Sequence, residues 1–372
     1  MGITGPMVYR LHEPLPWAAL ATPLAAAEDA LARLDQLVAA SPIRQGWGAR
    51  TAFADACASL ALQGDLVLLE DLVLHDAGRD RHAPTQELTR AHAVLRTRRR
   101  IAAADPGWAT SPAGLAALSE DLDGAKDQGE VPAPAVLPVD GADGEGDLAD
   151  VDDAFSAELA DIDALIARSS RLLADTGAVR EKSPLVYDPA WGETDRLAAW
   201  RQVIADTRIL PPVLAATIAV DAWVALEPLQ HRAWLGPLLA ADLLRARNKA
   251  RHHLPALASA LRRVPRDRWL VRDPLTRWLA VLGAVAMGAE QGMRDHDRWM
   301  LAREGLLLKV RGRRGNSSLP RLIDLVLARP LVSTTTIADE LGVTPRAAQT
   351  LVAELGLREL TGRERYRAWG IL

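Results

Sequence analysis

The sequence contains few of the residue types on which many protein chemistries depend. Cys57 is the only cysteine among 372 residues. One chain can therefore form no internal disulfide and no zinc site built on several cysteines. Aromatic residues make up 4% of the chain, and most of them are tryptophans. A lone thiol is compatible with a reducing compartment, and we expect the protein to be cytoplasmic.

The sequence also lacks the patterns that direct a chain to a membrane. Residues 1–20 do not combine a basic start with an apolar core, so we expect no signal peptide. Residues 209–229 are apolar but carry Pro211, Pro212, Asp221, Glu227 and Pro228. Residues 278–289 fall short of the ~20 residues that span a bilayer. Both segments predict buried helices of a soluble domain, and we expect no membrane partner.

Motifs of metal binding and catalysis are missing as well. The chain has no His-Glu-x-x-His, Gly-x-Ser-x-Gly or Walker-type pattern. His75 beside Asp76 is the densest local cluster, and we interpret it as the polar end of a surface helix. The run His296–Trp299 admits two interpretations, a wall of a cleft or an internal brace, and we favour the brace. We therefore expect no enzyme activity, catalytic residue, metal or cofactor.

Helical periodicity dominates what the sequence does contain. Alanine, leucine and arginine are abundant, and apolar residues recur at helical spacing through most of the chain. The Gly46-Trp47-Gly48 segment predicts a break, with a helix beginning at Thr51. Further helices are expected over residues 15–40, 66–75, 84–100, 155–173, 191–206, 212–226, 234–248, 254–263 and 275–304. Because no period-two pattern precedes residue 357, we expect a mainly α fold.

Changes in composition divide the chain into four predicted regions. Residues 1–118 form an N-terminal helical region, and residues 154–314 form a second helical domain. Between them, residues 119–153 place eleven acidic side chains among Gly, Pro and Ala from Asp121 to Asp153, which predicts a disordered linker. Residues 315–372 form the last domain, which we expect to be a small winged helix-turn-helix.

The helix order around residues 224–257 resembles the Fic family of nucleotidyl-transferases, a helical fold with the motif His-Pro-Phe-x-Asp-Gly-Asn-Gly-Arg. The leucine-rich helix at 238–244 and the segment 253–257 fit that pattern. The motif does not fit, since Leu226 stands where the catalytic histidine would be and Gln230 where the metal-binding acid would be. Gln63 likewise replaces the glutamate of the family's inhibitory helix. The resemblance implies a Fic-like body that has lost its catalytic motif.

A closer resemblance is to a bacterial family that combines such a helical region with a C-terminal helix-turn-helix. It is carried by the segments 69–76, 84–85, 88–89, 95–100, 296–299, 361–363 and 365–371. It implies the same architecture and DNA binding, without an established reaction. Two other functions stay open, a Fic-type nucleotidyl-transferase (AMPylase) and a protein-interaction scaffold.

The segment from Ser333 to Trp369 carries the pattern of a helix-turn-helix followed by a hairpin. Gly342 suits the tight turn, and Thr344 with Pro345 suits the start of a second helix. The expected inner faces consist of apolar residues at helical spacing: Ile337, Ala338, Leu341, Val343, Ala348, Leu351, Val352 and Leu355. A second helix of this kind lies in the major groove of DNA.

Local charge supports DNA binding by this end of the chain. The whole chain has a net charge of −4, yet from Lys309 onward eleven basic residues face six acidic ones. We expect Arg346 and Gln349 to contact base edges, with Thr344 on a phosphate and Thr350 on the same face. The remaining candidates belong to the hairpin wing, with Arg363 at its tip and Arg365 and Arg367 on one strand, and to the domain's start: Arg311, Arg313 and Arg314.

These observations predict a DNA-binding protein, a transcriptional regulator, whose partner is double-stranded DNA. A homodimer is expected, because two linked DNA-binding domains bind DNA more tightly than one. The alternative is that the helix-turn-helix packs only against its own protein or a partner.

Overall fold

A computed structural model describes residues 9–11, 13–78, 83–124, 188–269, 271–311, 318–360 and 367–371. The chain divides into two compact units, Met1–Lys126 with Gly192–Leu372 and, separately, Asp127–Trp191. Of the second unit only residues 188–191 are described, including the 3-10 turn Pro189–Trp191. Most of the predicted acidic linker and the helix expected over residues 155–173 therefore lie outside the described residues.

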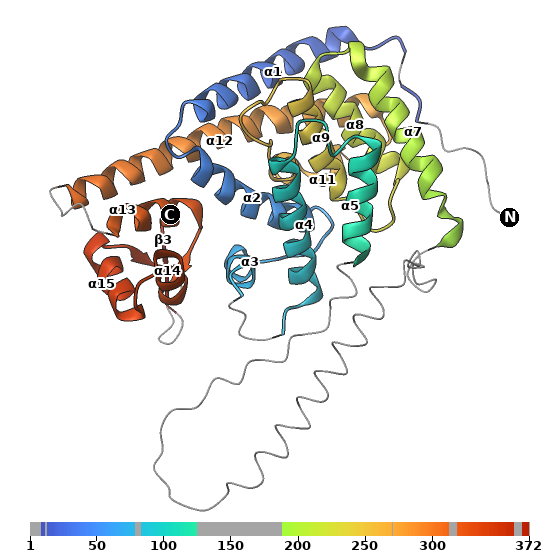
Figure 1. Ribbon diagram of the computed structural model, residues 1–372. Coiled ribbons are helices and arrows are strands. Elements are labelled where there is room, and N and C mark those ends of the chain that lie inside the picture. Colours follow the sequence, from blue (N-terminus) through green and yellow to red (C-terminus); the bar gives the residue numbers. More distant parts are fainter. Residues whose placement is uncertain are drawn as a thin grey trace, which may run out of the picture. The chain divides into compact units, whose positions relative to one another are not determined.

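The first unit is mainly helical, in agreement with the sequence-based prediction (Figure 1). Before its longest helix it contains the following helices and one 3-10 turn: α1 Trp17–Ala39, α2 Arg44–Ala61, α3 Leu69–Asp76, α4 Gln86–Ala103, α5 Pro112–Gly124, α7 Glu193–Asp206, η2 Thr207–Ile209, α8 Pro212–Leu226, α9 Leu235–Ala246, α10 Leu257–Leu261 and α11 Arg266–Trp269.

Helix α2 corrects one prediction. It runs straight through the Gly46-Trp47-Gly48 segment, where the sequence predicts a break. Gly46 is buried against the backbone of Leu327, and a Cβ at this position would lie 3.1 Å from the Leu327 carbonyl carbon. The glycine marks a close approach of two helices that are distant in sequence, and a local pattern cannot distinguish this from a break.

One hydrophobic core joins the helices of the body. It is built from α1, α2, α3, α4, α5, α7, α8, α9, α10 and the first half of α12 (Pro274–Val310). Within it, Asp55 of α2 and Arg98 of α4 form an ion pair at 2.7 Å with almost no exposure of either side chain. Asp55 also accepts a hydrogen bond from the Ser259 backbone N–H, so the pair ties α10 to α2 and α4. Hydrogen bonds of this kind offset the cost of burying both charges.

The 37-residue helix α12 connects the body to the C-terminal domain. It extends six residues beyond the predicted end at Glu304, and α1 lies along it (Figure 1). The C-terminal domain consists of α13 Leu319–Ala328, β1 Val332–Ser333, α14 Thr334–Leu341, α15 Pro345–Leu355, β2 Arg358–Glu359 and β3 Ala368–Gly370.

The strands of the C-terminal domain form a small antiparallel sheet in the order β1-β3-β2. Val332 pairs with Trp369, and Glu359 pairs with Trp369 from the other side. Strands β2 and β3 of the predicted hairpin pair antiparallel, and the residues between them lie outside the described part of the chain. Strand β1 is not predicted by the sequence, because two residues are too short to show a period.

A second hydrophobic core is shared by the C-terminal domain and the body. Leu34 of α1, Trp47 of α2 and Trp299 of α12 pack with the apolar side chains of α13, α14 and α15. Arg50 of α2, only 6% exposed, donates hydrogen bonds to four backbone carbonyls of the C-terminal domain: Val326, Arg329, Pro330 and Ile371. The helix-turn-helix is therefore docked on the body through both apolar packing and a buried cation.

Candidate nucleic-acid interface

Local hydrogen bonds define both helices of the helix-turn-helix. Ser333 caps α14, since its Oγ accepts from the Thr336 N–H at 3.1 Å. Gly342 ends α14 in the left-handed region, at φ 67°, as the sequence predicts. Thr344 then caps α15 by accepting from the Ala347 N–H at 3.2 Å, and Pro345 occupies the first turn. These residues fix the angle at which α15 leaves the turn.

The predicted inner faces are buried. Ile337, Ala338 and Leu341 of α14 face the core together with Ala348, Val352 and Leu355 of α15, while Val343 and Leu351 are half-buried beside them. This stripe leaves the opposite side of α15 to solvent.

The four residues expected on the reading face of α15 are all exposed: Thr344, Arg346, Gln349 and Thr350. Two of their hydroxyls are already engaged, since Thr344 caps the helix and Thr350 donates to the Arg346 carbonyl at 3.1 Å. Within the described part of the chain, the side chains of Arg346 and Gln349 form no hydrogen bond or ion pair. The body does not cover them, so they are available to an external partner.

The wing is described in part. Arg363 and Arg365 lie outside the described residues. Arg367, directly before β3, is exposed and pairs with Glu359 of β2 at 2.7 Å. Arg367 thus lies one residue before the strand on which the sequence places it, and its internal ion pair partly offsets its charge.

Several basic residues counted in the charge excess serve the fold itself. Lys309 donates to the Leu355 carbonyl at the end of α15, and Arg321 donates to the Glu340 and Leu341 carbonyls at the end of α14. Arg329 pairs with Glu340 at 2.6 Å. Cations at helix C-termini satisfy the last carbonyls and favour the helix dipole. The count from sequence therefore overstates the charge that is free to meet phosphates.

Further arginines near this face have different environments. Arg358 of β2 is exposed, although it is not among the predicted contact residues. Arg311 is exposed at the end of α12, while Arg313 and Arg314 lie outside the described residues.

The two histidine clusters singled out in the sequence have structural partners. Asp76 accepts two hydrogen bonds from Arg99, at 2.6 and 3.0 Å, and lies 3.3 Å from the ring of His92, which packs edge-on against His75. His296 is buried and bonds the Ser41 hydroxyl at 2.8 Å, which supports its interpretation as a brace. Among the residues described, no three His, Cys, Asp or Glu side chains gather in a way that could hold a metal ion.

A membrane-crossing helix would need a long apolar stretch. In the described ranges, no helix combines sufficient length with sufficient apolar character.

Comparison with known proteins divides the chain at the end of α12. A family model described as a protein of unknown function (DUF1612) matches residues 185–311, and a model described as an HTH DNA binding domain matches residues 319–372. The uncharacterized protein y4cF of Sinorhizobium fredii (strain NBRC 101917 / NGR234) is 46% identical over 355 residues, covering 91% of this chain and 93% of that protein. These matches confirm a helical region of unknown function followed by a helix-turn-helix. The resemblance to Fic transferases stays a prediction.

Proposed function

Since the chain belongs to the DUF1612 family and ends in a helix-turn-helix DNA-binding domain, we propose that it is a transcriptional regulator that reads a specific sequence in double-stranded DNA. The observation that carries this proposal is the solvent-facing side of α15, where Arg346 and Gln349 have no partner within the described residues. An arginine can bind guanine through two hydrogen bonds, and a glutamine can bind adenine in the same way.

In this proposal the other candidate residues contact the DNA backbone or the minor groove and position α15 on the DNA. Thr344 lies at the N-terminus of α15, where backbone N–H groups and the helix dipole favour a phosphate oxygen. Thr350 lies beside Arg346 on the same face. Arg363, Arg365 and Arg367 of the wing contact the minor groove or the phosphate backbone, which increases affinity without reading sequence.

The test uses the full chain, because the helix-turn-helix shares its core with the body. Genome-wide crosslinking identifies the bound sequence, and fluorescence anisotropy then measures affinity for that duplex and for each single-base variant. Arg346→Ala should lose ~1–3 kcal/mol of discrimination at one base pair. Arg201→Ala, which removes an exposed arginine of α7, is the matched control and should leave discrimination unchanged.

Two results would count against the proposal. A full chain that shows no salt-dependent binding to any duplex would remove DNA binding itself. If Arg346→Ala instead weakens binding uniformly across all sequences, Arg346 contacts phosphate and the reading role passes to other residues.

We also propose that two copies act together. A monomer reads one half-site, whereas a dimer reads two half-sites about one helical turn apart and gains affinity from both. Light scattering after gel filtration, with and without the identified duplex, tests this directly. A strict monomer on a single half-site would contradict it.

For the helical body we propose a Fic-like scaffold without transferase activity. Leu226, at the position of the missing catalytic histidine, is an apolar side chain buried at the end of α8. Gln63, at the position of the inhibitory glutamate, accepts a hydrogen bond from Arg90. Incubation of the full chain with labelled ATP and magnesium should give no label transfer to itself or to added protein, and transfer would restore the enzyme alternative.

A further inference from the structure

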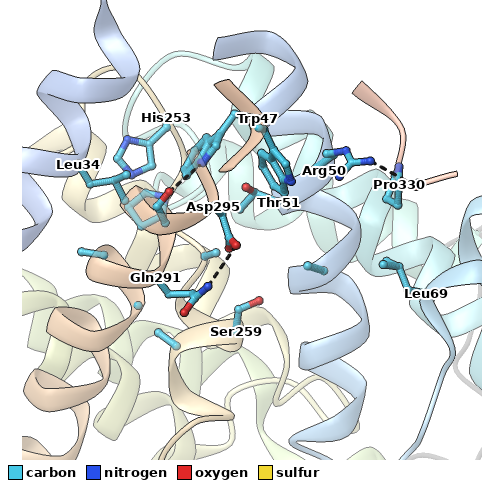
Figure 2. A pocket seen from close by; sticks show the side chains of 18 of the residues that line it. Leu34, Trp47, Arg50, Thr51, Leu69, His253, Ser259, Gln291, Asp295 and Pro330 are labelled. Atoms are coloured by element: carbon cyan, nitrogen blue, oxygen red, sulfur yellow. Dashed lines mark hydrogen bonds between the residues drawn. The ribbon is translucent and has the colours of Figure 1, made fainter. Parts of the chain in front are cut away.

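A cavity of about 680 Å³ lies between the helical body and the C-terminal domain. Its volume falls within the ~300–1,000 Å³ typical of small-molecule sites. Figure 2 shows side chains from both parts of the chain at its walls, with Leu34, Trp47, His253 and Gln291 from the body and Pro330 from the C-terminal domain. The cavity therefore lies directly at the docking contact of the helix-turn-helix.

The walls of the cavity are largely apolar. Leu31 and Leu34 of α1, Val285 of α12 and Leu331 before β1 contribute aliphatic surface, together with the ring of Trp47. A molecule that fills this space would bury apolar area, which is the main source of affinity at sites of this type.

Four lining residues hold a buried polar atom that lacks a hydrogen-bond partner within the described chain: Arg50 Nε, His253 Nε2, Ser259 Oγ and Trp299 Nε1. Buried polar groups in folded proteins are almost always paired, and each exception calls for an explanation. Each of these atoms is covered by neighbouring protein atoms, so a ligand in the cavity pairs with them only after a small movement of the wall.

The chemistry of these atoms restricts the occupant. His253 directs Nδ1 at the carboxylate of Asp35, 2.9 Å away, so its Nδ1 carries the proton and Nε2 is an acceptor. Trp299 and Arg50 offer N–H donors, and the Ser259 hydroxyl can act in either sense. The cavity thus presents mostly donors, which suits a ligand with oxygen acceptors.

Charge at the cavity favours an anion. Arg298 is paired with Asp295 at 3.0 Å, so these two charges largely offset each other. Arg50 is buried, bonds only to carbonyls and forms no ion pair within the described residues. Arg263 is exposed and has no acidic partner among the described residues. The acids that line the cavity are Asp295 and Glu70, so its three arginines exceed its carboxylates by one. A buried guanidinium without a counter-ion is costly, and a carboxylate nearby would reduce that cost.

We propose that this cavity binds a small, mainly apolar organic anion such as an aryl carboxylate, and that the bound ligand changes the affinity of the helix-turn-helix for DNA. The second half of this statement rests on the proposed function. The ligand would contact Pro330, Leu331, Leu360 and Ile371, which belong to the DNA-binding domain, as well as the helices of the body. A ligand that touches both sides of a docking contact stabilises one arrangement over others, and this is the physical basis of coupling.

The first experiment measures ligand binding without DNA. Isothermal titration of the full chain compares naphthalene-1-acetate with naphthalene-1-acetamide, which has the same shape but no charge. The acetate should bind about tenfold more tightly or better, the factor expected from one charge-assisted hydrogen bond. Equal affinities would overturn the anion assignment, and the absence of saturable binding of either probe would overturn the site.

Two variants locate the binding. Arg263→Gln removes a charge at the cavity that has no acidic partner among the described residues, whereas Arg294→Gln removes one from an exposed residue of α12 that does not line it. The first should weaken acetate binding several-fold, and the second should not. Ser259→Leu fills the cavity and should weaken both probes, with circular dichroism as the check on its fold. Binding unchanged in Arg263→Gln and in a folded Ser259→Leu would place the ligand elsewhere.

The second experiment measures DNA affinity with and without saturating naphthalene-1-acetate, using the sequence found by crosslinking. We expect a shift of about threefold or more that is lost in Ser259→Leu. If the probe binds and the DNA affinity does not change, the proposed coupling between ligand and DNA is wrong, but the proposed ligand site is still supported. If the chain binds no DNA at all, the proposed function fails, and the titration still decides the site independently.

Discussion

Arg50 and Ile371 are 321 positions apart in the sequence, and the guanidinium of the first donates two hydrogen bonds of 3.2 Å to the carbonyl of the second. The same guanidinium lies over the ring of Trp299, 5.0 Å from its centre. Burial and, to a smaller extent, the charge of Arg298 lower the pKa of Arg50, Asp295 opposes both, and the net result is a pKa of about 10. Arg50 therefore remains a cation at neutral pH and holds the end of the chain against α2.

Replacement of this cation should loosen the C-terminal domain. Arg50→Met keeps the length of the side chain but leaves the carbonyls of Val326, Arg329, Pro330 and Ile371 without their donor. We expect a loss of roughly 2–4 kcal/mol in the free energy of unfolding, measured by urea denaturation. Arg44→Met on the same helix removes an exposed arginine with one bond to the His252 carbonyl. This control should cost less than about 1 kcal/mol, and equal losses in the two variants would contradict the role of Arg50.

Two glycines of α2 offer a matched test of close packing. Gly46→Ala would place a methyl group 3.1 Å from the Leu327 carbonyl oxygen, so α13 must move. Overpacking of this kind costs about 1–3 kcal/mol. Gly48→Ala meets no atom within 4 Å and should stabilise the helix by about 0.5–1 kcal/mol. Thermal melts of both variants should therefore shift in opposite directions, and shifts of the same sign would refute the close approach.

Stability should decline in weak acid because of His253. Burial lowers the pKa of His253, the charges of Arg98 and His252 act in the same direction, and Asp35 opposes them. The unfolded chain, with a histidine pKa of about 6.5, takes up the proton first as the pH falls. Unfolding is thus favoured progressively below about pH 6.5, by up to ~1.4 kcal/mol per pH unit.

Asp35 adds a second loss at lower pH. Burial would raise the pKa of Asp35, but hydrogen bonds from His253 and His252 outweigh this and lower it. The contribution of the Asp35 carboxylate to stability is present above about pH 4 and disappears as the pH falls through its pKa in the folded state.

The contribution of His253 can be tested separately. His253→Asn retains a donor near the position of Nδ1 and cannot titrate. The melting temperature of this variant should change less between pH 7.5 and 5.5 than that of the wild type, and parallel curves would contradict the assignment.

The ion pair in the wing should reduce the affinity for DNA. Glu359→Gln removes the carboxylate that pairs with Arg367 at 2.7 Å and takes one negative charge away from the DNA-facing end. We expect tighter duplex binding at low salt and a plot of log affinity against log salt that is steeper by up to about one unit. Glu227→Gln, in the loop after α8, changes the net charge equally and serves as the control. An unchanged salt dependence in Glu359→Gln would place Arg367 away from the phosphates.

The sequence predicts the helix-turn-helix because its signals are local. Ser333, Gly342 and Thr344 act on backbone groups within three or four residues, and the apolar stripe of α15 repeats at one helical period. Such features can be recognised without knowledge of distant partners. The exposure of Arg346 and Gln349 can be predicted from the same apolar stripe, since both side chains lie on the opposite side of the helix.

Features that depend on distant partners are not predictable in this way. Gly46 resembles a helix breaker until Leu327 is placed against it. The basic residues Lys309 and Arg321 count toward the positive charge available to DNA until the ends of α15 and α14 are placed beside them. The cavity is lined by side chains from α1, α2, α10, α12 and the C-terminal domain, and these share no spacing that a motif could capture.

The shared second core has a consequence for how this family can diversify. The C-terminal domain packs its first helix, α13, into the core that it shares with the body. It therefore cannot be replaced by an unrelated DNA-binding domain, because the replacement would leave Leu34, Trp47 and Trp299 exposed on the body. New target sequences are accessible instead by changing outward side chains of α15 such as Arg346 and Gln349, which form no hydrogen bond or ion pair within the described residues. Specificity can therefore drift while the docking surface stays fixed.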